Sequence, residues 1–162
     1  MYANLFTLSL TLAAIGAGLM AGVYFAFSGF IMRALDQLGA ARAADAMNAI
    51  NEVILRSWFM LLFFGSTLLY AVLAAVAVFD TDLAARWLLF SSGSIYLIGM
   101  FLCTAVFNVP LNNRLAAAVD DERVKAETWA HYFTHWTRWN HLRSICSLTT
   151  LVLSIHYLVI YT

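Results

Sequence analysis

Four long stretches without a charged residue constrain the fold of this chain more than any other feature. They are Met1–Met32, Ser57–Phe79, Trp87–Asn113 and Ser144–Thr162. Each reaches the roughly 17–25 residues that a helix needs to cross a bilayer. A backbone inside lipid must satisfy its own hydrogen bonds, and a continuous apolar run does so as an α-helix. The sequence therefore predicts an all-α integral membrane protein, built as a bundle of four transmembrane helices.

Composition agrees with this class, because only 11% of the 162 residues are charged and 63% are hydrophobic. Soluble domains are about 25% charged. Four spans leave room for one compact bundle, so we expect a single domain over residues 1–162, with spans at about 5–35, 51–79, 83–113 and 138–161. The lipid bilayer is the expected partner, and a formal net charge of zero indicates no nucleic-acid partner.

The basic residues predict the orientation. Eight of the nine lie in the connections between spans one and two and between spans three and four. Connections rich in Lys and Arg face the cytoplasm, and both connections also contain amphipathic helical segments. We therefore expect an integral multi-pass protein of a bacterial inner membrane, with amphipathic cytoplasmic connecting helices and both termini on the non-cytoplasmic side.

The two halves of the chain are alike in outline, since each has a span, a basic connection and a second span. Asn51 and Asn140 both lie where the second span of a half begins. This outline favours a parallel tandem repeat of a helical hairpin, although the halves share few identical residues. Span 1 also contains Gly18-x-x-x-Gly22, a small-residue pattern typical of close helix packing. That Gly-rich face either packs within the bundle or mediates a homo-oligomer.

The segment Trp129–Arg143 holds three of the five Trp and three of the four His. At 100° per residue, an α-helix gathers large rings, an amide and a cation on one stripe. The members of this stripe are Trp129, Tyr132, Trp136, Trp139, Asn140 and Arg143. Such a face can bind a planar aromatic ligand, but Trp, Tyr and Arg also gather at membrane interfaces as anchors.

Polar side chains at the cytoplasmic ends of the other spans favour a ligand-binding face. They are Tyr24 and Ser28 in span 1, Asn51 in span 2, and Asn108 and Asn112 in span 3. Polar groups in a bilayer are costly unless they face the bundle and find partners. Their similar depth therefore predicts a shared polar pocket with the aromatic stripe as one wall. The alternative is structural, because Asn side chains also cap helices and join them by hydrogen bonds.

The histidines offer a metal site only as an alternative. His131 and His135 are at i and i+4, a spacing that can bind a metal, but no acid at a helpful spacing joins them, and a solvated face is the preferred interpretation. No two His lie mid-membrane on facing spans, so a bis-His haem is not indicated. We therefore predict no cofactor, and the sequence leaves metal and haem open.

Four segments resemble the DUF1772, or anthrone oxygenase-like, membrane family. They are Gly22–Ser28 (GVYFAFS), Ala46–Asn51 (AMNAIN), Phe107–Asn112 (FNVPLN) and Trp129–Arg143. The resemblance covers nearly the whole chain, and the last two segments are the most specific. It implies a small four-helix membrane protein, and some fungal relatives are linked to oxidation of anthrones to anthraquinones. The residues that match the pattern are Asn108, Pro110, Asn112, Trp129, Tyr132, Trp136, Trp139, Asn140, His141 and Arg143.

The resemblance implies a chemistry that these residues can perform on a hydrophobic aromatic small molecule. His141 would remove the acidic C–H proton of an anthrone, and Arg143, Asn140 or Asn108 would stabilise the enolate oxygen. The carbanion would then react with O₂ directly, without a cofactor. The expected substrate-binding residues are Trp129, Tyr132, Trp136, Trp139, Asn112, Asn51, Tyr24 and Ser28.

A non-catalytic function is the alternative interpretation. The chain would then hold a quinone, a lipid or a haem, or form a subunit of a larger membrane complex. The spans contain no acid, which argues against a proton pump or an ion-coupled transporter. The sequence alone leaves enzyme and binding protein open.

Overall fold

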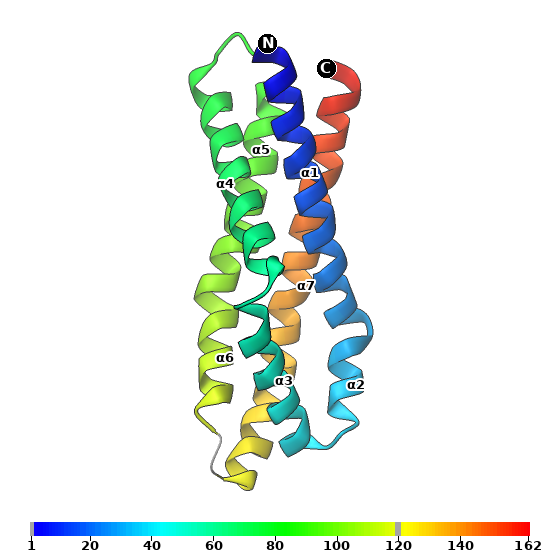
Figure 1. Ribbon diagram of the computed structural model, residues 1–162, viewed down its shortest axis with the longest axis vertical. Coiled ribbons are helices and arrows are strands. Elements are labelled where there is room, and N and C mark those ends of the chain that lie inside the picture. The colour runs from blue at the N-terminus through cyan, green and yellow to red at the C-terminus, as the bar shows by residue number, and fades with distance from the viewer. Residues whose placement is uncertain (1, 119–120) are drawn as a thin grey trace.

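The computed structural model describes residues 2–118 and 121–162, and it confirms the all-helical class. Four helical rods lie side by side along one long axis (Figure 1). Each rod contains a stretch that is long and apolar enough to cross a membrane, namely Asn4–Asp36, Trp58–Phe79, Arg86–Ala116 and Glu122–Tyr161. The chain is therefore an integral multi-pass membrane protein.

Rods one and three each contain loosely wound π-helical turns. Rod one consists of α1 (Tyr2–Ala26), the π-helical turn η1 (Phe27–Ile31) and α2 (Met32–Asp36). Rod three consists of α5 (Arg86–Tyr96), η2 (Leu97–Leu102), η3 (Thr104–Asn108) and α6 (Val109–Ala116). Pro110 lies in the first turn of α6. A proline cannot donate to the preceding turn, and the π-helical winding directly before it lets the rod continue.

Rod two is broken in the middle, which the predicted span 51–79 does not anticipate. It consists of α3 (Ala40–Ile54) and α4 (Trp58–Phe79). Ser57 has an extended backbone, with φ −101° and ψ 167°. Its Oγ accepts a hydrogen bond from the backbone N–H of Phe59 at 3.2 Å. This cap starts a new helix, so Asn51 lies on α3 and not on the transmembrane helix α4.

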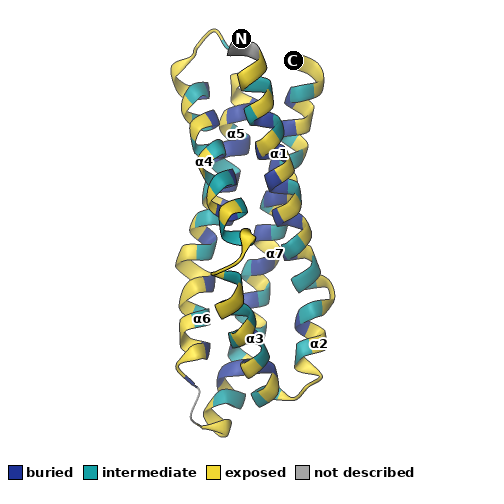
Figure 2. Cartoon of the chain, viewed as in Figure 1, coloured by how far each residue is buried: buried dark blue, intermediate teal, exposed yellow. Residues whose placement is uncertain are grey.

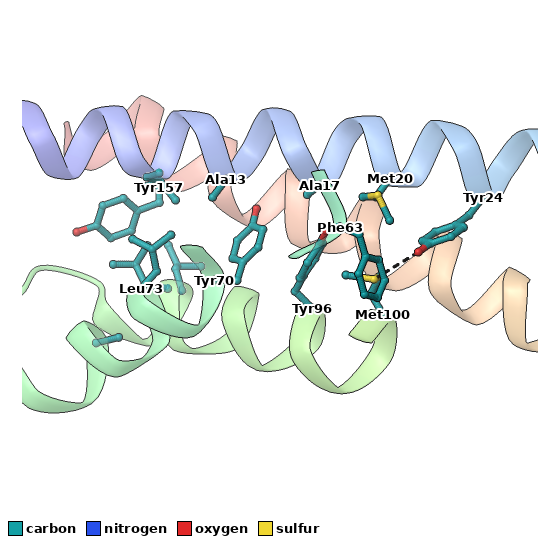
Figure 3. Close-up of a cluster of buried hydrophobic side chains, with 14 residues drawn as sticks. Ala13, Ala17, Met20, Tyr24, Phe63, Tyr70, Leu73, Tyr96, Met100 and Tyr157 are labelled. Atoms are coloured by element: carbon teal, nitrogen blue, oxygen red, sulfur yellow. Dashed lines mark hydrogen bonds between the residues drawn. The ribbon is translucent and has the colours of Figure 1, made fainter. Parts of the chain in front are cut away.

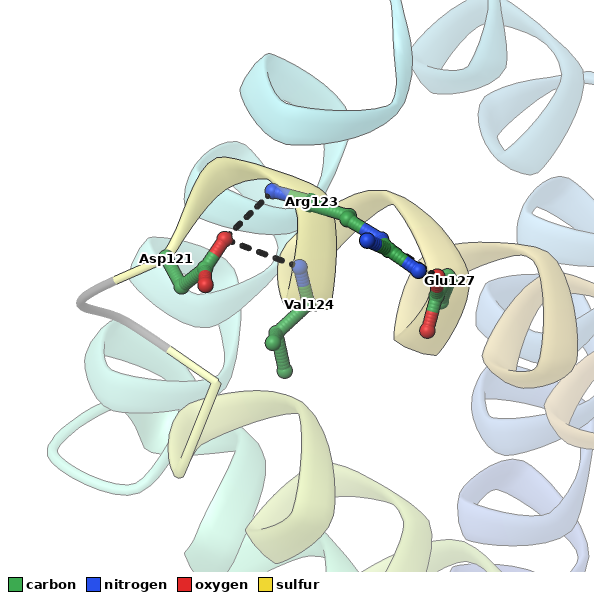
Figure 4. A network of polar contacts seen from close by, with 4 residues as sticks. All are labelled: Asp121, Arg123, Val124 and Glu127. Atoms are coloured by element: carbon green, nitrogen blue, oxygen red, sulfur yellow. Dashed lines mark hydrogen bonds and ion pairs between the residues drawn. The ribbon is translucent and has the colours of Figure 1, made fainter.

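Rod four is the single helix α7 (Glu122–Tyr161), with 40 residues. It begins well before the predicted start near residue 138. The Asp121 side chain caps it by accepting from the backbone N–H groups of Arg123 and Val124 at 2.8 and 3.3 Å (Figure 4). An ion pair between Arg123 and Glu127 follows at 3.1 Å. The polar segment before span four is therefore the first part of the same helix.

The bundle is longer than a bilayer is thick. With 22 residues, α4 measures about 33 Å at 1.5 Å per residue, close to the roughly 30 Å hydrocarbon core. The break between α3 and α4 carries Arg56 and the 85% exposed Trp58, residue types typical of the membrane interface. Beyond the break lie α2, α3, α6 and the first half of α7 (Figure 1). We call this end, which contains the α2–α3 and α6–α7 connections, the basic end.

The buried residues lie on the faces where the rods meet, and the exposed residues lie on the outside of the bundle (Figure 2). In the membrane half, the rings of Tyr70 and Tyr96 pack against each other with centroids 4.5 Å apart and an interplanar angle of 34° (Figure 3). Their hydroxyls bond Ser154 and Ser66 at 2.9 and 2.7 Å. Many large side chains on the outer faces are exposed, for example Leu68 at 66%. An apolar outer surface of this kind is compatible with lipid contact.

The glycines of α1 pack mainly inside the bundle. A Cβ built on Gly16 would lie 2.7 Å from Ser66 of α4, and one on Gly18 would lie 3.5 Å from Leu151 of α7. Gly22 is exposed, with nothing within 4 Å of such an atom. Helix packing within one chain therefore explains two of the three glycines, and a homo-oligomer through this face stays a prediction.

Candidate functional site

A cavity of about 280 Å³ lies at the level where α3 ends and α4 begins. Its polar lining comes from all four rods and comprises Tyr24, Asn51, Thr104, Asn112 and Arg143. Its aromatic lining comprises Phe27, Phe59, Phe63, Phe64, Phe101 and Trp136. Five of the residues expected in a shared polar pocket thus line one cavity: Tyr24, Asn51, Asn112, Trp136 and Arg143.

Arg143 is the most unusual group of this cavity, because its guanidinium is buried at 4% exposure. Its Nη2 donates to Asn140 Oδ1 at 2.8 Å, and its Nη1 donates to Thr104 Oγ1 at 3.3 Å. Its Cζ also lies over two aromatic rings, 4.3 Å from the Tyr24 centroid and 5.1 Å from that of Trp136. All these partners are neutral, and the ion pairs within residues 2–118 and 121–162 involve other side chains.

Two asparagine side chains accept hydrogen bonds from this guanidinium. The Asn140 Nδ2 donates to the Tyr24 carbonyl and to Ser28 Oγ, both at 2.6 Å, while its oxygen accepts from Arg143. In the amide orientation that satisfies both of its polar atoms, the Asn108 oxygen accepts from Arg143 Nη2 at 3.2 Å and from Trp136 Nε1 at 3.3 Å. Asn140, Ser28 and Asn108 do not line the cavity. Their contacts position Arg143 instead.

The stripe on α7 divides between the cavity and the core of the basic end. Trp129 and Tyr132 stack with ring centroids 5.8 Å apart, and both are almost fully buried. Trp129 Nε1 donates to Asp36 Oδ1, and the Tyr132 hydroxyl donates to Asn112 Oδ1, each at 2.8 Å. These two rings therefore join α7 to α2 and α6, and neither lines the cavity.

Trp139 and His141 lie outside the cavity. Trp139 stacks on Phe107 with centroids 3.7 Å apart and an interplanar angle of 7°. His141 is exposed. Because α7 is one uninterrupted helix, His141 follows Asn140 by about 100° and faces outward. The histidine expected as the base thus does not line the site, and α7 continues as one α-helix from Glu122 to Tyr161.

His131 and His135 lie next to each other on α7, with ring centroids 4.0 Å apart. His135 Nδ1 is 2.9 Å from the His131 carbonyl oxygen, a backbone contact within the helix. Within the described residues, no group of three His, Cys, Asp or Glu side chains gathers as a metal would require. A metal at this pair would therefore have only the two imidazoles as side-chain ligands.

Sequence reasoning missed several lining residues. Thr104 contacts Arg143, but its Oγ1 also donates to the Met100 carbonyl at 2.7 Å, as Thr commonly does within helices. Nothing in the sequence separates it from the other hydroxyl residues of the spans. Likewise, nothing in the sequence distinguishes Phe59, Phe63 and Phe101 from the other apolar residues of the spans. Their place at the cavity depends on the break in rod two.

These features define a small multi-pass membrane protein with a cavity between its helices that is lined by aromatic, aliphatic and a few polar side chains. Residues 56–153, more than half of the chain, match the family described as anthrone oxygenase, also known as DUF1772. The chain belongs to the anthrone oxygenase family. Searches of curated proteins and of solved structures gave no match. The matched range includes Asn108, Asn112, Trp136 and Arg143, whereas Tyr24 and Asn51 precede it.

Proposed function

We propose that this protein oxidises hydrophobic, anthrone-like aromatic compounds with O₂ in the cavity beside Arg143. The observation that carries the proposal is a buried guanidinium at the wall of an aromatic-lined cavity. Membership of the anthrone oxygenase family supports the same chemistry. Flat rings pack well against the Phe and Trp side chains, and the Arg143 guanidinium can donate to a ring-bound oxygen.

The reaction balances without an external reductant. An anthrone methylene, CH₂, becomes a carbonyl, and this oxidation releases four electrons that reduce one O₂. One oxygen atom forms the new carbonyl and the other leaves as water with the two methylene hydrogens. Loss of the first proton to water gives an enolate that can react with O₂ directly, so no cofactor is needed in this proposal. Arg143 stabilises the enolate oxygen by charge and hydrogen bonding.

Direct proton removal by His141 does not suit this arrangement, because that side chain is exposed on the outer face of α7. We therefore assign no general base to the described lining residues. The variant His141→Ala should keep the wild-type rate of anthrone oxidation. A large loss in this variant would restore His141 as a participant.

The test is turnover of a test anthrone by the protein purified in detergent, with the rate of spontaneous oxidation subtracted. Formation of anthraquinone should match consumption of O₂ mole for mole. Arg143→Gln should lower kcat/KM about 100- to 1,000-fold, as loss of an oxyanion donor does. Arg138→Gln is the matched control, since Arg138 is exposed on the same helix. Wild-type protein that forms no quinone above background, or Arg143→Gln with full activity, would refute the proposal.

A non-catalytic binding function is the second candidate, and one observation favours it. None of the lining residues within the described chain is a His, Asp or Glu. An enzyme that abstracts protons usually has such a group within reach. Stoichiometric binding of an anthrone or a quinone without any product would identify the protein as a carrier or sensor of such compounds.

A further inference from the structure

We propose that the cavity selects its ligand in the anionic form. The ligand would be an amphiphile with one ionised acidic oxygen beside Arg143 and an aromatic body among the phenylalanine side chains. This inference rests on the proposed function, because it concerns the ligand of the same cavity. It adds the charge state of that ligand, which neither the family nor the predicted chemistry specifies.

The first observation is the uncompensated charge of Arg143. A guanidinium withdrawn from water in a membrane protein is costly unless an opposite charge or a full set of hydrogen bonds accompanies it. Asn140, Thr104 and Asn108 supply three acceptors, all of them neutral, and two ring faces add cation–π contact. The ion pairs of the described residues lie elsewhere. A ligand anion would complete this site as its missing counter-ion.

The second observation is independent and comes from another rod. The Nδ2 atom of Asn51 on α3 is buried and has no hydrogen-bond partner within the described chain. Asn51 lines the same cavity as Arg143. A buried N–H without an acceptor is unfavourable. An acidic oxygen in the cavity offers an acceptor for Asn51 as well as a charge for Arg143.

The third observation concerns the proton. Among the described lining residues, only Tyr24 and Arg143 have ionisable side chains. The Tyr24 hydroxyl donates to Met100 Sδ at 3.4 Å, and Arg143 is a cation. Neither group is suited to accept a proton from a bound neutral acid. The ligand therefore has to bring its negative charge with it.

The position of the cavity fits such an amphiphile. Four of its phenylalanine side chains, Phe59, Phe63, Phe64 and Phe101, come from the first turns of α4 and from η2, within the membrane half. Its amides, Asn51 and Asn112, come from α3 and α6 at the basic end. A flat acid dissolved in the bilayer places its rings in the hydrocarbon and its charge at the interface. The break between α3 and α4 lies at the same level.

The experiment compares two ligands that cannot be oxidised at the reacting carbon: anthraquinone-2-carboxylate and anthraquinone-2-carboxamide. Their binding to the intact protein in detergent is measured by quenching of tryptophan fluorescence and by calorimetry. The wild type should bind the carboxylate about 10- to 100-fold more tightly, the effect of a hydrogen bond to a charged group. Arg143→Gln should lose this preference, and Arg138→Gln should keep it.

Two further variants keep the inference testable if the Arg143→Gln protein does not fold. Arg143→Lys keeps the charge and should retain part of the preference, while Asn51→Ala should weaken carboxylate binding more than carboxamide binding, because a charged acceptor makes the stronger hydrogen bond. Equal affinity of the wild type for both ligands, or no binding of the carboxylate, would overturn the inference. If the wild type oxidises an anthrone but binds the carboxylate and the carboxamide equally, only this inference is refuted. If it prefers the carboxylate but oxidises no anthrone, only the oxygenase proposal is refuted.

Discussion

The contact between Asn140 and Arg143 makes a quantitative prediction about stability. Asn140 is fully buried, and it makes three hydrogen bonds: to the Tyr24 carbonyl, to Ser28 and from Arg143. Two of these are neutral, each contributing about 0.6–1 kcal/mol in a membrane protein. The third involves a charged donor and contributes about 1.5–3 kcal/mol. Asn140→Ala should therefore lower the free energy of unfolding by about 3–5 kcal/mol.

A double-mutant cycle separates the loss of hydrogen bonds from the exposure of a poorly partnered charge. Asn140→Ala leaves Arg143 buried with one acceptor fewer, which adds to the cost of the single variant. In the double variant with Arg143→Met, that charge is gone, so the two effects should not add. We expect a coupling free energy of about 0.5–3 kcal/mol, the range for residues in one hydrogen-bond network.

Unfolding in mixed detergent micelles, followed by far-UV circular dichroism, measures these free energies. Asn113→Ala is the matched control, because Asn113 is exposed on α6. Additivity of the two substitutions within about 0.5 kcal/mol would show that Asn140 does not hold the guanidinium. A wild-type stability for Asn140→Ala would contradict the network altogether.

Two further predictions concern packing and the size of the cavity. Gly93→Ala should destabilise the bundle by about 1–3 kcal/mol, because its Cβ would lie 2.7 Å from Ala74 Cβ on α4; Gly65→Ala, with nothing within 4 Å, is the control in the same thermal unfolding assay. Phe101→Trp should fill part of the cavity and raise the KM for a test anthrone about tenfold. Ile98→Trp is the control, because Ile98 is 64% exposed on η2, and it should leave this KM unchanged. Equal thermal stability of the two alanine variants, or an unchanged KM for Phe101→Trp, would contradict the packing described above.

The membrane class and the number of spans can be predicted from the sequence, because the hydropathy of each span is summed over many residues and no single residue decides it. A charge-free run of bilayer length has few other structures available to it. The inward face of α7 also follows from periodicity, since the helix is regular from Glu122 to Tyr161. Trp129, Tyr132, Trp136, Asn140 and Arg143 are all buried. Trp139, at the edge of the predicted stripe, is only half-buried.

The break between α3 and α4 could not be predicted from the same rules. Val53, Ile54 and Leu55 continue an apolar pattern through the position where the helix ends. Ser57 is a possible N-cap in the sequence, but packing of α3 against α7 is a tertiary feature that no local pattern encodes. The same limit applies to the cavity, because its volume exists only where this rod is interrupted. Hydrophobic periodicity predicts which face is buried but does not predict where that face is incompletely filled.

The interruption also gives Asn51 and Asn140 different surroundings. The tandem repeat predicted from the sequence would place these two residues at related positions, yet α3 ends three residues after Asn51 whereas α7 continues past Asn140. Asn140 is therefore held inside a continuous helix, with Tyr24 and Ser28 of rod one and Arg143 of its own helix as partners. Asn51 instead faces the opening created by the break, with an amide N–H that lacks a partner within the described residues. One asparagine thus positions the buried cation, and the other is available to a ligand beside it.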